Sequence, residues 1–243
     1  MSNHCRQPTE KLTRYVLKGV VILLIFLEVH MGTNRNILRP GQKERLRKGA
    51  IQGSCYYNHF LKDKTFIVVT EDYMYCSITF KKQDFCHFTG LSIARVSESN
   101  FFDICLNGTI TNSNIRDEQH YDYNTLRVKN NILKKLNMFL HADVSTNLFI
   151  SGLVTNTFTF SCAIRNDTEN MTICFVGENN RARSLRKARN SRNTQSEKQI
   201  IGIFELYNNK WDKCIYIRNR QDIVYNFNHD IFSDELKRYL HID

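Results

Sequence analysis

The chain has 243 residues, of which 42% are hydrophobic and 24% are charged. This composition excludes a disordered or collagen-like chain and supplies enough apolar residues for a sizeable core, and the scarcity of Pro and Gly favours one compact unit. Lys and Arg number 34 against 24 Asp and Glu, giving a net charge of +10, which favours polyanionic partners such as nucleic acid or an anionic membrane surface.

An apolar segment lies near the N-terminus, and its uninterrupted part spans only residues 19–27. A membrane-spanning helix needs roughly 20 apolar residues, and no small-x-small cleavage site of a signal peptide follows. Three interpretations stay open: translated sequence upstream of a true start at Met31, a membrane-associating helix, or a helix packed in the core. Residues 1–30 are therefore treated as an apolar extension, and no stable membrane span is expected.

The next segments predict a helix followed by a hairpin. Residues 42–61 form a helical pattern that begins after Pro40 and carries basic side chains in its first turns. Residues 65–70 and 73–80 form two extended runs, and the second alternates apolar with polar side chains. A period of two predicts a β-hairpin with one buried face.

Helices are also predicted in the centre of the chain. A short one begins at an N-cap at Asp84, carries His87 and ends at Gly90. A second covers residues 101–106, and a longer one covers residues 126–140, where leucines recur at the spacing of one helical stripe. The lysines assigned to positions outside that stripe are Lys129, Lys134 and Lys135.

The second half of the chain changes to an alternating pattern. Strands are predicted at residues 158–165, 171–176, 200–206 and 214–217, with asparagine-containing turns between them. Helices first and an antiparallel sheet afterwards describe an α+β fold, in which N-terminal helices pack on a C-terminal antiparallel sheet.

A basic segment without any acidic residue covers residues 181–192. It is interpreted either as a solvated basic helix or as a helix that clamps phosphate, with Arg183 and Lys187 one turn apart on one face. The second interpretation is favoured, because like charges at that spacing repel each other and would have no use without a bound phosphate. The side chains expected to meet the same phosphate are Arg165, Ser191 and Ser196.

The sequence lacks the motifs of most cofactor-dependent and metal-dependent enzymes, including the P-loop, the Rossmann glycines and the H-E-x-x-H pair. Its 8 cysteines include no Cys-x-x-Cys pair, which argues against a tight metal site. They favour reduced, buried thiols and a cytoplasmic protein over a disulfide framework. No metal and no cofactor are therefore expected.

Cations and histidines remain, and these are the groups that a metal-independent ribonuclease uses. In such an enzyme a base deprotonates the ribose 2′-OH, which attacks the adjacent phosphate while cations stabilise the developing charge. His87 is the first candidate for acid or base, although a histidine between Phe85 and Phe88 is also typical of a packed core. His120, beside Tyr121, is expected in a loop, where plain solvent exposure is its alternative.

Several segments together resemble a known family. They are N-I-L-R-P-G-Q-K-E-R-L-R-K at residues 36–48, F-K-K-Q-D-F-C-H-F-T-G-L at 80–91, Q-H-Y-D at 119–122, A-I-R-N-D at 163–167 and R-A-R-S-L-R-K at 181–187. In order and spacing they resemble the fourth class of phage-barnase-EndoU-colicin-RelE-like nuclease domains, the PBECR group. The resemblance covers residues 36–231 and leaves residues 232–243 as a C-terminal helix or tail.

The resemblance implies a barnase/EndoU/RelE-like fold, with N-terminal helices on a four-stranded antiparallel sheet. It also implies a toxin-like ribonuclease from a phage or mobile-element conflict system, for which an antidote or immunity protein would be a partner. The family's His-x-Thr-Gly motif corresponds to His87, Thr89 and Gly90, with Phe88 where Leu is more usual.

The sequence therefore predicts an endoribonuclease that cleaves single-stranded RNA to products ending in a 2′,3′-cyclic phosphate. The expected catalytic residues are His87, Thr89, Arg165, Arg183 and Lys187. The expected substrate-binding residues are His120, Tyr121, Arg186, Ser191 and Ser196. The alternative is a non-catalytic basic protein that binds nucleic acid, and a third interpretation, a membrane-anchored surface protein, depends wholly on the N-terminal segment.

Overall fold

The computed structural model describes residues 36–136, 138–141, 146–155, 158–188 and 196–242. These residues belong to one compact unit. The predicted N-terminal extension, residues 1–30, lies outside the described residues. Within the described part of the chain, no helix combines the length and the apolar character needed to cross a membrane.

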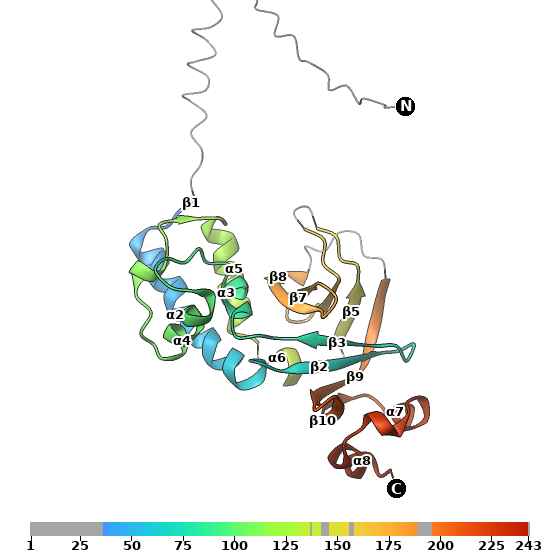
Figure 1. Cartoon of the computed structure of the whole chain (residues 1–243). Coiled ribbons are helices and arrows are strands. Elements are labelled where there is room, and N and C mark those ends of the chain that lie inside the picture. Colours follow the sequence, from blue (N-terminus) through green and yellow to red (C-terminus); the bar gives the residue numbers. More distant parts are fainter. Residues whose placement is uncertain (1–35, 137, 142–145, 156–157, 189–195, 243) are drawn as a thin grey trace, which may run out of the picture. The chain divides into compact units, whose positions relative to one another are not determined.

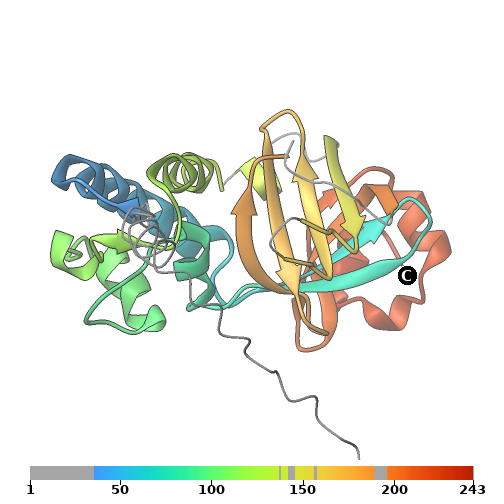
Figure 2. The same ribbon diagram turned by 90° about the horizontal axis from the view of Figure 1, so that it is seen from above.

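Most helices gather on one side of the strands, as Figures 1 and 2 show. The long helix α2 packs against α4 and α5, and a two-stranded pairing of β1 with β4 lies beside them. The elements of this helical part are β1 (Asn36–Ile37), α2 (Pro40–Phe60), α3 (Asp84–Thr89), α4 (Glu98–Leu106), the 3-10 helix Asn112–Asn114, β4 (Glu118–Gln119), α5 (Tyr123–Leu133) and α6 (Met138–His141).

The strands form one eight-stranded sheet in the order β10-β9-β2-β3-β8-β7-β6-β5. Because β9 also pairs with β5, the pairing order closes on itself and leaves β10 as a further strand alongside β9. The strands are β2 (Thr65–Thr70), β3 (Tyr75–Thr79), β5 (Asn147–Ser151), β6 (Cys162–Asn166), β7 (Met171–Val176), β8 (Arg181–Arg186), β9 (Ser196–Tyr207) and β10 (Lys210–Ile217).

The fold is α+β, as the sequence predicts, but its sheet differs from the expected one. It has eight strands rather than four, and the early hairpin β2–β3 lies in its middle instead of staying with the helices. β3 meets β8 in parallel through a single pair, Thr79 with Arg181, whereas the other pairings of this sheet are antiparallel. The sheet is therefore not confined to the C-terminal half.

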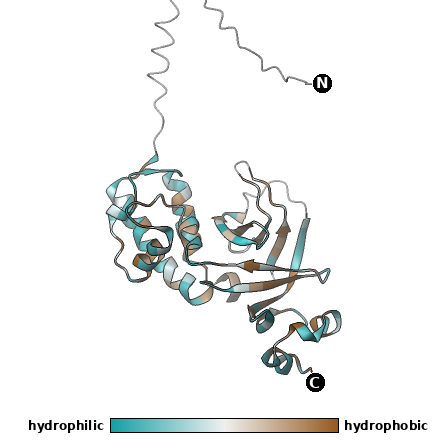
Figure 3. Ribbon diagram, viewed as in Figure 1, coloured by the Kyte–Doolittle hydropathy of each residue, from teal (hydrophilic) through white to brown (hydrophobic). Residues whose placement is uncertain are grey.

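The main core joins the helices to the sheet. Tyr57 of α2 is fully buried, and its ring centroid lies 5.5 Å from that of Phe85 and 5.6 Å from that of Phe88. Figure 3 shows β9 as hydrophilic over its first residues and hydrophobic afterwards, which matches its change from half-exposed to buried positions. A second apolar cluster around Trp211 is covered by α7 (Arg220–Asn226) and α8 (Asp234–Leu240).

Several predicted elements are confirmed by the structure. The helix α2, the hairpin β2–β3 and the strands β7, β9 and β10 occur where the patterns place them, whereas the strand predicted at 158–165 begins only at Cys162. The turn between β9 and β10 has Asn208 and Asn209 at φ values of 48° and 60°, the positive angles that a type I′ hairpin turn requires. α3 ends at Gly90 with φ 69°, as its glycine predicts.

Other expectations were wrong. The predicted helix over residues 126–140 is interrupted, because α5 ends at Leu133 and α6 begins at Met138. The basic segment predicted as a helix forms β8 over Arg181–Arg186, while residues 189–195 lie outside the described residues. Asp84 occupies the first helical position of α3 rather than its N-cap, which is Gln83.

Candidate active site

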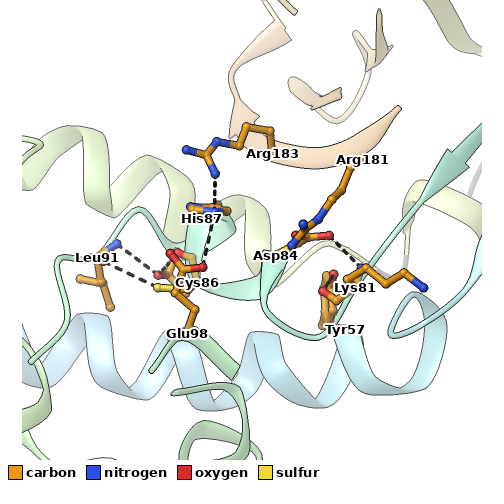
Figure 4. Close-up of polar contacts among 10 residues, drawn as sticks. Tyr57, Lys81, Asp84, Cys86, His87, Leu91, Glu98, Arg181 and Arg183 are labelled. Atoms are coloured by element: carbon orange, nitrogen blue, oxygen red, sulfur yellow. Dashed lines mark hydrogen bonds and ion pairs between the residues drawn. The ribbon is translucent and has the colours of Figure 1, made fainter. Parts of the chain in front are cut away.

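α3 and β8 lie side by side and are joined by two side-chain contacts (Figure 4). The Asp84 carboxylate is 1% exposed and accepts a hydrogen bond from the Arg181 Nε at 2.7 Å. It also forms an ion pair with the Arg181 Nη2 at 2.6 Å. One helical turn further on, the His87 Nε2 contacts an Arg183 Nη1. Residues three apart on a helix share a face, as do residues two apart on a strand, so the two contacts align.

A β-bulge lies at Arg183. In the pairing of β7 with β8, Phe175 lies opposite Ala182 while Cys174 lies opposite Ser184. Arg183 is therefore the extra residue between two paired neighbours, and bulges of this kind change where a side chain points. Within β8, Arg183 is exposed, whereas its neighbours Ala182 and Ser184 are buried.

His87 does not belong to the core. Phe85 and Phe88 are fully buried against Tyr57, whereas His87 lies on another side of α3 with 23% of its side chain exposed. The alternative interpretation as a packed core histidine is therefore wrong.

The surroundings of His87 favour a neutral imidazole. Burial lowers its pKa from the usual value near 6.5, and the Arg183 guanidinium lowers it further, while the Glu98 carboxylate opposes both. The Glu98 Oε2 lies 3.7 Å from the His87 Nε2. Arginine is always charged and only donates, so the His87 Nε2 accepts from Arg183 and the ring proton is held at Nδ1.

A cavity of about 520 Å³ opens beside this contact. The side chains around it that bear on chemistry are His87, Glu98, His120, Tyr121, Arg183 and Arg186. A second cavity of about 440 Å³ is lined by Lys129 and Lys187. The two cavities share Tyr121, Ser184 and Arg186 in their walls, so they adjoin along β8.

Half of the predicted site residues are thus brought together. The first cavity unites His87, His120 and Tyr121 from the helical part with Arg183 and Arg186 from β8. Lys187 lines the neighbouring cavity. It follows Arg183 along an extended chain rather than lying one helical turn away, so the geometry expected for the clamp was wrong. Arg183, Arg186 and Lys187 come together because they follow one another along β8 and the residue after it, beside α3.

Three predicted residues lie away from the two cavities: Thr89, Arg165 and Ser196. Thr89 is 3% exposed, and its hydroxyl donates to the Cys86 carbonyl at 2.7 Å and accepts from the Leu91 N–H at 3.1 Å. It therefore stabilises the end of α3 and does not face the cavity. Arg165 on β6 pairs with Glu197 at 2.6 Å.

Ser196 hydrogen-bonds to Ser151 at 2.7 Å. Neither it nor Arg165 lines the two cavities along β8. Ser191 lies outside the described residues.

The structure adds residues that the sequence analysis missed. Lys129 was placed outside the helical stripe but is 4% exposed. The signal was present in its spacing, because Lys129 follows Leu126 by three residues and precedes Leu133 by four, which puts all three on one face. Glu98 and Ser184 had no sequence signal of their own. Asp84 was noticed only as a helix cap.

No grouping of three or more His, Cys, Asp or Glu side chains suited to a metal ion occurs among the described residues. The cysteines that the structure describes are free thiols, as predicted. The site therefore consists of two histidines, a carboxylate and several cations around an open cavity.

Comparison with known proteins identifies one family. Residues 53–221 match PBECR4, described as phage-Barnase-EndoU-ColicinE5/D-RelE like nuclease4. Neither the curated proteins nor the solved structures provide a match to the chain. The matched region contains α3 and β8 with the cavity between them and covers more than half of the chain, which confirms the resemblance seen in the sequence: the chain belongs to the PBECR4 family of nucleases.

Proposed function

We propose that this protein is a metal-independent endoribonuclease that cleaves single-stranded RNA by attack of the ribose 2′-OH on the adjacent phosphate. The observation that carries the proposal is the contact of the His87 Nε2 with Arg183 at the wall of the cavity. It joins a neutral base and a fixed cation, the two groups that this reaction needs at one phosphate.

His87 is the general base of the proposed reaction. Its lowered pKa keeps it neutral near pH 7. When the Arg183 guanidinium turns from the Nε2 to the phosphate of the bound RNA, the Nε2 lone pair is released and takes the proton from the 2′-OH as the oxygen attacks phosphorus. The Arg183 guanidinium has five N–H donors, which it offers to the phosphoryl oxygens once it has turned from His87. His120, in the same cavity, is the candidate donor of a proton to the departing 5′-oxygen.

The ribose requirement follows from the mechanism. DNA has no 2′-OH and offers no nucleophile to His87. The aromatic rings of Tyr121 and Phe158 also line the cavity, and Phe158 is 47% exposed. Exposed rings beside cations suit unpaired bases, which stack on aromatic faces while their phosphates meet the cations.

The central test measures cleavage of a labelled single-stranded RNA by the purified chain in the presence of EDTA. We expect products ending in a 2′,3′-cyclic phosphate and no cleavage of the 2′-deoxy analogue. His87→Ala should lower the rate about a hundredfold to ten-thousandfold, the usual cost of removing a general acid or base. The matched control is His59→Ala, because His59 is exposed at the end of α2.

Equal rates for His87→Ala and the unchanged protein would refute the role of His87. Salt-sensitive binding of RNA without any product would instead favour the second candidate, a basic protein that binds nucleic acid without cleaving it. The net charge of +10 supports binding in both cases, so only the products distinguish them.

The family description supports a proposed context in conflict between phage or mobile elements and their hosts. In that context the protein acts as a toxin on cytoplasmic RNA, and an antidote protein with an acidic surface would block the cationic cavity. Expression in a bacterial cell should then stop growth, and His87→Ala should relieve the arrest.

The proposal also includes a barnase-like arrangement of the fold. Its four-stranded antiparallel sheet would correspond to β5–β8, and α3 and α5 pack against β8, the last of these strands.

A further inference from the structure

Lys129 is a buried cation at the boundary of the two cavities. It extends from α5, is 4% exposed and lines the second cavity beside Ser184 and Arg186, which line both. Its Nζ donates to the Ser184 Oγ and to the Leu185 carbonyl, each at 3.0 Å. The same Nζ lies 5.4 Å from the centre of the Tyr121 ring.

Gly90 provides the space that this lysine needs. A Cβ on Gly90 would lie 2.6 Å from the Lys129 Cδ, closer than real Cβ contacts, and at a tight 3.3 Å from the Tyr121 Cδ2. The glycine that ends α3 therefore also lets Lys129 extend past the helix end to β8. The turn next to His87 and the position of Lys129 are coupled through this one contact.

The charge on Lys129 is not balanced by a carboxylate. Among the described residues, Lys129 forms no ion pair, and its acceptors are neutral oxygens. Its pKa is lowered to about 8, chiefly by burial and also by nearby Arg186, whereas Cys174 opposes the shift. Buried charges are normally paired, so an anion in the adjoining cavity would complete this environment.

Ser184 can connect Lys129 to such an anion. A hydroxyl has one proton to donate and two lone pairs to accept with. Because the Lys129 ammonium only donates, it occupies a lone pair of the Ser184 Oγ and leaves the hydroxyl proton available. Ser184 lines both cavities, so this proton can be donated to a group bound where they adjoin.

We propose that Ser184 and Lys129 form a phosphate-binding site at the junction of the two cavities, in which the Ser184 hydroxyl donates to a phosphate oxygen and Lys129 acts as the positioning residue. The identification of that phosphate as one of the RNA backbone rests on the proposed function. The second cavity then holds the part of the RNA next to the phosphate that His87 and Arg183 contact.

The test measures the affinity of a single-stranded 2′-O-methyl RNA, which cannot be cleaved by 2′-OH attack, using fluorescence anisotropy. Ser184→Ala should weaken binding about tenfold or more, because hydrogen bonds to charged groups contribute about 1.5–3 kcal/mol. Lys129→Met should weaken binding at least as much. In the double variant the two losses should not add, because both act through one contact.

Two matched controls separate binding from folding. Lys43→Met removes another buried lysine, 8% exposed, which bonds the Ile115 carbonyl, pairs with Asp117 and lines neither cavity. Ser54→Ala removes another buried hydroxyl, which donates to the Ile51 carbonyl in α2. Both should bind the RNA like the unchanged protein, and circular dichroism checks the fold of each variant. If Lys129→Met does not fold, Ser184→Ala decides the proposal.

A pH series adds a readout that packing alone would not move. The charged and titratable groups that face Lys129 are Tyr121, Arg186 and Cys174. Affinity should fall as the pH rises through about 8 and Lys129 loses its proton. In Lys129→Met this step should be missing. A step of equal size in both proteins would contradict the assigned role of Lys129.

The outcomes distinguish the two proposals. A protein that cleaves RNA but binds the 2′-O-methyl strand equally well after Ser184→Ala retains the proposed function and loses the phosphate site. A protein that cleaves no RNA but loses binding on both substitutions retains the phosphate site and loses the proposed function. Equal losses in the substituted and control proteins would also overturn the phosphate site.

Discussion

Arg165 and Arg183 both come from the sheet, but their surroundings differ. The Arg165 Nη1 and Nη2 meet the two Glu197 carboxylate oxygens at 2.6 Å and 2.8 Å, and its Nε lies 3.1 Å from Asp167. Arg183 contacts the His87 ring at an open cavity. A guanidinium held by two carboxylates has its charge and donors already used, so it is poorly suited to hold a phosphate.

The buried lysines repeat this contrast. Lys43 lies 2.7 Å from the Asp117 carboxylate, while Lys129, among the residues that the structure describes, meets only neutral oxygens and an aromatic ring. In both comparisons the cation without a carboxylate pair is the one beside a cavity. Positive charge alone therefore did not identify the site; the distribution of the carboxylates did.

Among the substitutions that test this comparison, Arg183→Ala has the largest expected effect. Removal of a fixed donor to a developing negative charge costs about a hundredfold to a thousandfold in kcat, and we expect a loss of RNA cleavage in that range. Arg183→Lys should recover part of it, because an ammonium keeps the charge but not the planar fork. A steady-state assay with the labelled RNA measures both. Full activity of Arg183→Ala would remove the distinction between the two arginines.

The next effect concerns pH. His87 acts as a base only when neutral, so activity should be lost as the pH falls through its pKa, which lies below the usual value near 6.5. Glu98→Gln removes a cause that raises this pKa and should move the acid limb to lower pH. Arg183→Ala removes a cause that lowers it and should move the limb of its residual activity to higher pH.

The measurement is the pH profile of kcat/KM for the unchanged protein and both variants. Stability should follow the same direction. The unfolded chain takes up the His87 proton near pH 6.5 and the folded chain only at lower pH, so the free energy of unfolding decreases as the pH falls through that window. Shifts of the same sign in the two variants would contradict the arrangement around His87.

The smallest effect is expected for Arg165→Ala. Its carboxylate partners are partly exposed, and pairs of this kind contribute about 0–1 kcal/mol. RNA cleavage should stay within about twofold of the unchanged protein, since activity losses follow only from groups that act on the transition state. Thermal unfolding and the cleavage assay together check this prediction. A loss as large as that of Arg183→Ala would return Arg165 to the catalytic residues.

Much of the fold could be predicted because its signals are local. α2, the hairpin β2–β3 and the end of α3 at Gly90 follow from patterns within a few residues. β8 could not be predicted in the same way, because its Arg, Ala and Leu residues are good helix formers. β8 pairs with β7, which precedes it in the chain, and this pairing outweighs the local preference for a helix.

The sequence by itself determined the family, the α+β class and the candidate histidine with its turn glycine. Only the tertiary structure decided which cations meet that histidine, because this depends on the packing of α3 against β8 and on the carboxylates near each arginine. The tertiary structure also decided that Lys129 packs against Gly90 and donates to Ser184. Local periodicity fixes which face of an element a residue occupies, whereas contacts between distant segments fix its charge environment.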